Sequence, residues 1–127
     1  MLVSFVIDHA TIMAGAHFTG TLAAKNCTSD KVDITHPSGC QTVEGIFKDG
    51  GEVGGEAPVV CTQVIAGDSI APGQTRRWTI TLDSKAEPNA QADRPDLPPG
   101  AYDAVAGIST THGVWYAKPV TVTIEGS

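Results

Sequence analysis

Apolar and polar residues alternate with a period of two along several short stretches of this chain. In residues 17–24, Phe18 and Leu22 share one face with small residues, while a histidine and two threonines take the other. Residues 77–82 and 118–125 repeat the pattern with tryptophan, isoleucine, leucine and valine. Successive side chains of a β-strand point to opposite faces, so this alternation predicts strands with one buried face. No window of a dozen residues has the apolar spacing of an amphipathic helix.

Short strands are predicted along the whole chain, at residues 2–7, 17–24, 32–35, 42–48, 58–65, 74–82, 101–108 and 118–125. Glycine and proline corners separate them. Pro72-Gly73 and Pro99-Gly100 each predict a type II turn, because glycine accepts the positive φ that this turn requires. About seven to eight short strands between such turns are typical of one fold, so we predict a single all-β domain over residues 1–127, an immunoglobulin-like antiparallel β-sandwich. Trp78 and Tyr102 are expected in its core.

Two segments lack strand character and are predicted to be loops. Residues 49–57 are rich in glycine and acidic residues, which predicts a flexible loop. Residues 84–99 form a longer polar stretch, and loops beyond about 12–15 residues often carry function. The second loop offers an arginine that we expect to be exposed, in a segment stiffened by prolines, as a candidate binding loop. Its candidate residues are Asp93, Arg94, Pro95 and Asp96.

Charge and hydropathy argue against two classes of partner. The chain has 127 residues and 8 Lys and Arg against 14 Asp and Glu, for a formal net charge of −6. Its basic residues are scattered apart from the Arg76-Arg77 pair, so no positive stripe is present to neutralise a polyanion. No apolar run approaches the ~20 residues that cross a bilayer. We therefore expect neither nucleic acid binding nor membrane insertion.

Three cysteines, Cys27, Cys40 and Cys61, bear on the cellular compartment. No Cys-x-x-Cys pair is present, which removes the ligand spacing of zinc ribbons and of thioredoxin-like motifs. A disulfide between Cys40 and Cys61 would close a glycine-rich loop and stabilise the fold by roughly 3 kcal/mol, leaving Cys27 free. The alternative is three buried thiols that act as small apolar side chains. We predict the disulfide, and hence an extracytoplasmic or secreted protein, although no signal is evident in the chain.

Candidate catalytic residues are few. No Gly-x-Ser-x-Gly elbow is present. The four histidines are His9, His17, His36 and His112. They stand far apart near predicted strand ends or loops, where we expect solvated surface histidines. The sequence therefore predicts no enzyme activity, no catalytic residues and no cofactor.

Carboxylates in the 49–57 segment are candidate ligands for a metal ion. Asp49, Glu52 and Glu56 offer oxygen ligands that a glycine-rich loop could wrap around calcium. The alternating Asp-x-Asp pattern of calcium loops is missing, and acidic glycine loops are usually only soluble. We therefore expect no metal.

Trp115 and Tyr116 are adjacent, so on a strand one of the two rings should be exposed. Exposed aromatic rings favour contact with a sugar or a protein. The alternative is that one ring closes the end of the sandwich. The pair is a candidate aromatic contact.

Three motifs carry a resemblance to a known group of proteins. They are Ala71-Pro72-Gly73, the stretch Leu97-Pro98-Pro99-Gly100-Ala101-Tyr102, and the closing Lys118-Pro119-Val120-Thr121-Val122-Thr123-Ile124. Over residues 17–125 the chain resembles bacterial immunoglobulin-like domains, and most of all the intracellular proteinase inhibitor (BsuPI-like) family. The resemblance implies the sandwich fold and an inhibitory activity. The three cysteines depart from that group and favour a relative outside the cytoplasm.

Taken together, these observations predict a noncatalytic immunoglobulin-like binding or structural module that mediates protein contacts outside the cytoplasm, with a partner that the sequence does not identify. One alternative is a protease inhibitor that acts through residues 84–99 or 49–57. Another is a carbohydrate-binding module that uses Trp115 and Tyr116. The oligomeric state stays open.

Overall fold

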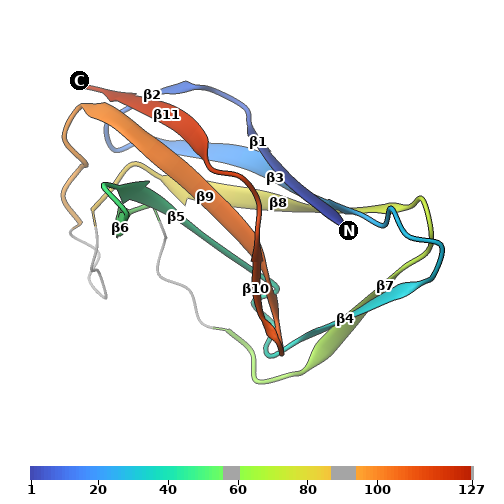
Figure 1. Cartoon of the computed structure of the whole chain (residues 1–127). Helices are drawn as coiled ribbons and strands as arrows, with labels where there is room; N and C mark the ends of the chain where they lie inside the picture. Colours follow the sequence, from blue (N-terminus) through green and yellow to red (C-terminus); the bar gives the residue numbers. More distant parts are fainter. Residues whose placement is uncertain (56–60, 87–93, 127) are drawn as a thin grey trace.

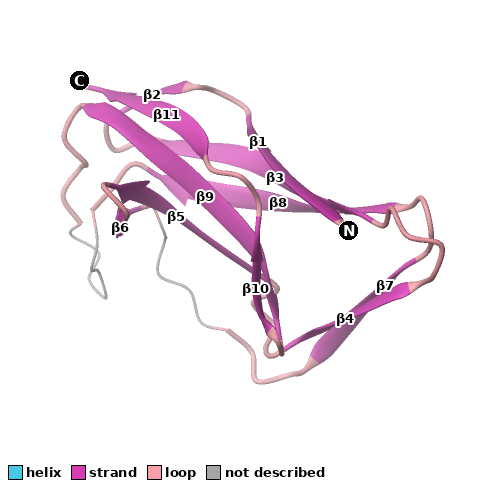
Figure 2. Cartoon of the chain, in the orientation of Figure 1, coloured by secondary structure: helices cyan, strands magenta, loops and turns pink. Residues whose placement is uncertain are grey.

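The computed structural model describes residues 1–55, 61–86 and 94–126, and this part of the chain contains strands and no helix (Figure 2). The predicted all-β class is therefore confirmed. The strands of the described residues are β1 (Leu2–Ile7), β2 (Thr11–Met13), β3 (His17–Lys25), β4 (Val32–His36), β5 (Thr42–Lys48), β6 (Gly51–Gly54), β7 (Ala66–Ile70), β8 (Thr75–Asp83), β9 (Gly100–Thr110), β10 (Gly113–Tyr116) and β11 (Val120–Glu125).

These strands form two facing sheets and a separate ribbon (Figure 1). A three-stranded sheet has the order β1-β3-β8, and a six-stranded sheet has the order β2-β11-β9-β5-β6, with β10 also paired to β9. The pairing of β2 with β11 is parallel, whereas the other pairs are antiparallel. The ribbon of β4 and β7 runs from the end of β3 and β8 across to the end of β9 and β10 (Figure 1). The sandwich prediction is confirmed, with additional short strands at β2, β6 and β10.

The core consists of the inward faces of the two sheets, as the alternation predicted. Its buried residues include Phe5, Phe18, Leu22, Ile80 and Leu82 from the three-stranded sheet, and Ile12, Ile46, Ala104, Ala106, Ile108, Val122 and Ile124 from the six-stranded sheet. Trp78 is 8% exposed and Tyr102 is 5% exposed, so their predicted core positions are confirmed. Burial of this apolar surface is the main force that holds the sheets together.

The segment 49–57 differs from the prediction of a flexible loop. Its described part contains β6, which pairs with β5 in a hairpin. Asp49 and Gly50 form the connection, with φ of 53° and 84°. Positive φ at both central residues is the geometry of a type I′ turn, for which Asp-Gly is a preferred sequence. The Asp-Gly dipeptide of this turn is present in the sequence, but the many glycines around it led to the prediction of a flexible loop.

The segment 58–65 also differs from its prediction as a strand. Residues 56–60 lie outside the described residues, and residues 61–65 form no strand. The strand begins later, as β7, and contains alanine, glycine, aspartate and serine before Ile70. Pairing with β4 therefore defines this strand more than its own β-propensity does.

The two predicted turns have different outcomes. At Pro72-Gly73, Gly73 has φ of 79° and Gln74 N donates to Ala71 O at 3.0 Å, which confirms a type II turn. Gly100 has φ of 152° instead, outside the range of a type II turn, and it opens β9 directly. Tyr102 then donates its hydroxyl hydrogen to Pro98 O at 2.5 Å. A tyrosine at the start of a strand that bonds back to the chain upstream is a corner typical of immunoglobulin-like sandwiches.

The ribbon of β4 and β7 is fastened at one end by Asn26, which is fully buried. Its Nδ2 donates to Asp30 O at 2.7 Å and to Ile70 O at 2.9 Å, and its Oδ1 accepts from Thr28 N at 2.9 Å. A buried amide whose donors and acceptor all have partners fixes the chain where β3 leads into the ribbon.

Candidate functional site

The outer face of the six-stranded sheet carries an aromatic side chain above a bare stretch of backbone. Tyr116 on β10 lies opposite Gly107 on β9, and Tyr116 is 58% exposed. A Cβ atom at Gly107 would lie 2.9 Å from Tyr116 Cδ1 and 2.8 Å from Val114 Cγ1. The absence of a side chain at Gly107 therefore lets the tyrosine ring lie close against the sheet.

Gly45 on β5 makes a second bare position on the same face, two residues from Phe47. A Cβ atom at Gly45 would lie 2.6 Å from Glu52 Oε2 and 3.3 Å from Phe47 Cε1. The Glu52 carboxylate, from the neighbouring β6, thus occupies the space above this glycine. Together these side chains surround a shallow concavity of about 220 Å³. We call it the outer-face concavity; its lining residues are Val43, Glu44, Phe47, Glu52, Val105 and Tyr116.

Trp115 behaves differently from its neighbour. It pairs with Ile108 on β9, which is fully buried, and it packs against the hydrophobic core. The prediction that one ring of the pair is exposed is therefore confirmed for Tyr116, while Trp115 takes the structural role that was its alternative. Tyr116 is therefore the more exposed ring of the two, and Trp115 is half-buried.

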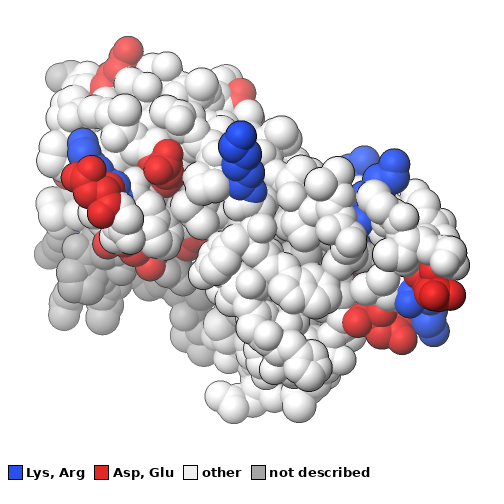
Figure 3. Space-filling model, in the orientation of Figure 1, with Lys and Arg blue, Asp and Glu red and all other residues white. Residues whose placement is uncertain are grey.

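Charged side chains lie mainly away from this aromatic strand. In Figure 3, charged side chains gather toward the two ends of the visible face, and the surface over β10 between them is mostly uncharged. A ligand that contacts Tyr116 would meet valine and phenylalanine side chains together with the carboxylates of Glu44 and Glu52.

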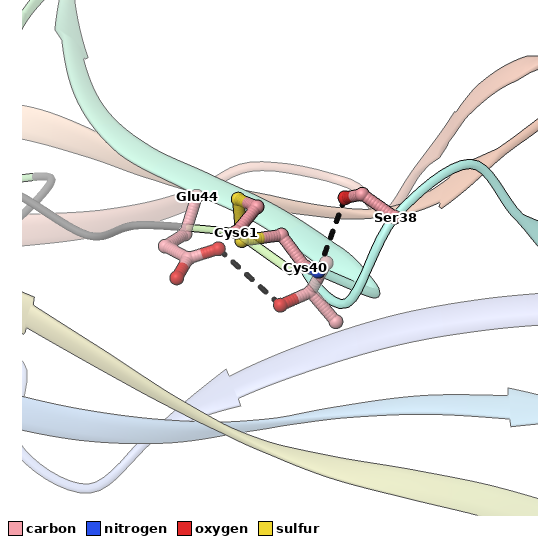
Figure 4. Close-up of a disulfide and its surroundings, with 5 residues drawn as sticks. Ser38, Cys40, Glu44 and Cys61 are labelled. Carbon is pink, nitrogen blue, oxygen red and sulfur yellow. Dashed lines mark hydrogen bonds between the residues drawn. A yellow bond between two sulfur atoms is a disulfide. The ribbon is translucent and has the colours of Figure 1, made fainter. Parts of the chain in front are cut away.

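A larger groove of about 540 Å³ lies between β5 and β8, where the two sheets separate. Trp78, Thr79 and Thr81 line one side, and the Cys40–Cys61 disulfide lies on the other. The bridge has a Cα–Cα distance of 5.2 Å, within the normal range for disulfides, and Figure 4 shows it beside Ser38 and Glu44. The predicted pairing of Cys40 with Cys61 is thus present in the structure, and Cys27 is free and exposed.

His36 contradicts the prediction that all four histidines are solvated, because its side chain is fully buried. Its Nδ1 lies 2.8 Å from Ser109 O and its Nε2 lies 2.7 Å from Asp68 Oδ2. Arg76 Nε donates to the other oxygen of Asp68 at 3.2 Å. A carbonyl and an ionised carboxylate only accept hydrogen bonds, so both contacts are satisfied when both ring nitrogens carry hydrogen. His9, His17 and His112 are exposed, as expected.

The His36 contacts also act on Asp68. Burial raises the pKa of Asp68, but hydrogen bonds from His36 and Arg76 and the positive charge of Arg76 outweigh it, so the pKa lies below its ordinary value. The group joins β4, β7, β8 and β9. Its oxygen acceptor on β9 is a backbone carbonyl and no nucleophile, so we interpret the group as a structural fastening of the ribbon.

Arg94 contradicts the prediction of an exposed arginine. Its side chain is 4% exposed and forms a bidentate ion pair with Asp83, with Nη1–Oδ2 at 2.6 Å and Nη2–Oδ1 at 2.8 Å. It also donates to Lys85 O and Ala86 O. The guanidinium is therefore used inside the protein. Of the other candidate loop residues, Pro95 and Asp96 are exposed, and Asp93 lies outside the described residues.

The candidate calcium ligands are only partly described. Asp49 is exposed at the tip of the β5–β6 hairpin, Glu52 lies above Gly45, and Glu56 lies outside the described residues. Within residues 1–55, 61–86 and 94–126, no group of three or more His, Cys, Asp or Glu side chains is placed to hold a metal ion. The same part of the chain contains no helix that is long and apolar enough to span a membrane.

The outer face of the three-stranded sheet carries a second exposed apolar feature. Leu2 and Val6 are 59% and 63% exposed and point to the same side of β1, because they are four residues apart on one strand. β1 is also the edge strand of its sheet. The sequence placed Val3, Phe5 and Ile7 correctly on the inward face, but it gave no reason for large apolar side chains on the other.

Comparison with known proteins shows the fold and no family. No family model matches the chain, and no curated protein matches it. A β-glucosidase from Erythrobacter marinus is 12% identical with a TM-score of 0.56, over 96% of this chain and 15% of that one. A β-glucosidase from Listeria innocua is 12% identical with a TM-score of 0.51, over 98% and 16%. The sporulation control protein Spo0M from Bacillus subtilis is 15% identical with a TM-score of 0.51, over 99% and 49%.

These solved structures are therefore similar to this chain in architecture alone. The chain spans less than half of the length of each. Nothing in these matches bears on the resemblance to the intracellular proteinase inhibitor family, which stays a prediction. The chain is shown to be a small all-β sandwich domain.

Proposed function

We propose that this chain is a noncatalytic immunoglobulin-like module that mediates protein contacts outside the cytoplasm. Its fold supports this proposal, because nearly the whole chain superposes on 15–16% of two β-glucosidases and on 49% of Spo0M. The same architecture therefore occurs as a component of longer proteins. A component of this kind acts through the contacts that its surface makes, so its function is inferred from surface features and not from the fold.

The observation that carries the proposal is the outer side of β1. Leu2 and Val6 expose large apolar side chains there, at 59% and 63%. The strand also lies at the edge of the sheet, where backbone groups remain for pairing with another chain. Apolar side chains next to an open strand edge favour a protein partner, since the partner can pair its backbone and bury the side chains together.

The disulfide supports a location outside the cytoplasm. Cys40 and Cys61 are joined in a half-buried bridge, and such bridges persist in oxidising compartments. The exposed Cys27 is compatible with either compartment.

A photo-activated cross-linking residue at position 6, introduced into the chain in its source organism, tests the contact. The control carries the same residue at Thr123, which is exposed on the other sheet. We expect a discrete protein adduct from position 6 that weakens when Leu2 is changed to Asp, and none from position 123. The same adducts from both positions, or none from position 6, would overturn the proposal.

The inhibitor alternative loses its main support. The arginine that a protease would have gripped in residues 84–99 is buried in an ion pair with Asp83. The described part of residues 49–57 is a hairpin with a two-residue turn, which is shorter than the loop that the alternative assumed. Carbohydrate binding, in contrast, gains support from the exposed Tyr116.

A further inference from the structure

We infer that two copies of this chain associate by pairing their β1 strands antiparallel, around a two-fold axis at Ser4. The inference rests on the proposed protein contact at β1 and names the partner as a second copy. A symmetric contact of this kind needs a strand that matches its own reverse, in its backbone and in its side chains.

The backbone groups of alternate residues on β1 face away from its sheet. β1 pairs with β3 on one side, and at the end of that pairing Asp8 N donates to Thr19 O at 2.9 Å. Hydrogen-bonded positions alternate along an antiparallel pair, so the even-numbered residues of β1 bond to β3 and the odd-numbered ones point the other way. Within the described residues, these outward N–H and C=O groups have no backbone partner; they belong to Val3, Phe5 and Ile7. Figure 1 shows β1 beyond β3 and β8, at the open border of its sheet.

The positions of these groups limit how two β1 strands can pair. Odd-numbered residues have to lie opposite odd-numbered residues, since only they present hydrogen-bonding groups to a second copy. When Val3 lies opposite Phe5 of the second copy, Ser4 lies opposite the second Ser4. Leu2 of each copy then lies opposite Val6 of the other. This register brings together the exposed apolar side chains of the strand, which are 59% and 63% exposed, on one face.

The neighbouring registers do not bring these side chains together. A shift of one strand by two residues in one direction places Leu2 opposite Asp8, which sets a carboxylate against an apolar side chain. The opposite shift places Leu2 opposite Ser4. The register around Ser4 is therefore the one in which β1 is complementary to itself.

The charges near β1 permit this approach. The strand Leu2–Ile7 contains no charged side chain, although each copy carries a net charge of −6. On the outer face, Ala23 of β3 lies next to Ser4, so the row that crosses the axis contains only small side chains from these two strands. Lys25 lies next to Leu2 and brings a positive charge to each end of the contact. No carboxylate of β1 or of its partner strand β3 faces its own counterpart in this register.

The size of the contact sets its expected strength. One short strand from each copy gives an interface at the low end of specific protein contacts, where association is weak or transient. We expect a dissociation constant of roughly 10–100 µM. The joined sheet would have the order β8-β3-β1-β1-β3-β8 and would cover Leu2 and Val6 of both copies.

Sedimentation velocity of the purified protein, from roughly 5 to 500 µM, tests for the dimer, because this range brackets the expected dissociation constant. Substitutions at Ser4 distinguish a second copy from any other partner, because residue 4 faces itself only in the symmetric pair. We expect Ser4→Asp and Ser4→Lys each to weaken self-association about tenfold through like-charge repulsion, and an equimolar mixture of the two variants to restore it. Thr79→Asp and Thr79→Lys are the matched controls, exposed on the other edge strand of the same sheet, and should leave the dissociation constant unchanged.

An introduced cysteine tests the register. With the exposed Cys27 changed to serine, Ser4→Cys places two thiols opposite each other, with Cβ atoms about 4.5–5.5 Å apart. We expect mild oxidation to convert this variant to a disulfide-linked dimer on a non-reducing gel. Thr121→Cys in the same background is the control, exposed on the other sheet, and should stay monomeric.

Three results would each overturn the inference: a protein that stays monomeric over the whole concentration range, a mixture of the Asp and Lys variants that associates no better than either alone, or Ser4→Cys cross-linking no faster than Thr121→Cys. In any of these cases, an adduct of position 6 with a different protein would still support the proposed contact. The failure of this inference is therefore distinguishable from the failure of the proposed function.

Discussion

The buried pair of Asp83 and Arg94 shows how one side chain can change the interpretation of a whole segment. Both side chains are 4% exposed, and the arginine donates two hydrogen bonds to the carboxylate and two to backbone carbonyls. An ion pair of this kind fixes residue 94 against the end of β8. Removal of either partner leaves the other as an uncompensated buried charge.

We predict that Asp83→Asn or Arg94→Met alone lowers the free energy of unfolding by about 3–5 kcal/mol. The double substitution Asp83→Leu with Arg94→Met should recover part of this loss, because it removes both charges and leaves apolar side chains. Urea denaturation followed by tryptophan fluorescence measures all three variants. Single variants within about 1 kcal/mol of the original protein would contradict the burial of the pair.

The ionisation of Asp68 makes the stability of the folded protein depend on pH. Its pKa in the folded protein lies below the ordinary value, so the ionised form is stabilised by folding. The resulting stability is present above the ordinary pKa of an aspartate, about 3.9, and is lost as the pH falls below it through the lower pKa of the folded state.

We therefore predict that the original protein is more stable than Asp68→Asn at pH 7, and that the difference narrows as the pH falls below about 4. Asp33→Asn is the matched control, because it removes a charge from the same ribbon at a side chain that is 67% exposed. Unfolding free energies at several pH values check the prediction. A difference that is constant with pH, or equal for the two variants, would count against it.

At the scale of elements, the sequence predicted strands better than it predicted their partners. The alternation in β3, β8 and β11 has one apolar face, and all three lie where it placed them. β5 has apolar residues on both faces, with Ile46 inward and Phe47 outward, so periodicity could not tell that Phe47 lines a surface site. Polar β7 could not be found by periodicity at all, because pairing with β4 and the contacts of Asp68 hold it.

Substitutions at Asn26 test whether its buried amide holds the ribbon of β4 and β7 in place. We predict that Asn26→Asp is more destabilising at pH 7 than Asn26→Ala, although its side chain has nearly the shape of asparagine. Asn26 donates hydrogen bonds from its side-chain amide to Asp30 O and Ile70 O. In the Asp variant a carboxylate oxygen, which can only accept, faces these two carbonyl oxygens. Leaving such buried groups without a hydrogen bond costs about 1–3 kcal/mol or more. Amide hydrogen exchange should accelerate first in β4 and β7. Equal protection of the ribbon in Asn26→Asp and the original protein would refute this role.

At the scale of the whole molecule, the sequence predicted the sandwich and the disulfide but only part of the candidate site. Tyr116 was a candidate because it is adjacent to Trp115, and its exposure agrees with strand geometry. Gly45 and Gly107 were not candidates, because the side chains that lie over them come from β6 and β10 and reach them only after these strands have paired with β5 and β9. Arg94 was misplaced for a similar reason, since its partner lies on β8 and contacts it only in the folded chain.

The contribution of the disulfide to stability bears on the proposed location outside the cytoplasm. Cys40 and Cys61 are 21 positions apart in sequence, and closing a loop of that size removes entropy from the unfolded chain worth about 3 kcal/mol. We predict that Cys40→Ala with Cys61→Ala loses this amount of unfolding free energy, and that a reductant destabilises the original protein to the same level. Cys27→Ala is the control, because this thiol is free and exposed and its removal should cost little. Denaturant titrations with and without reductant measure each variant. If the reduced protein is as stable as the oxidised one, the fold does not need an oxidising compartment, and the proposed location outside the cytoplasm loses its physical support.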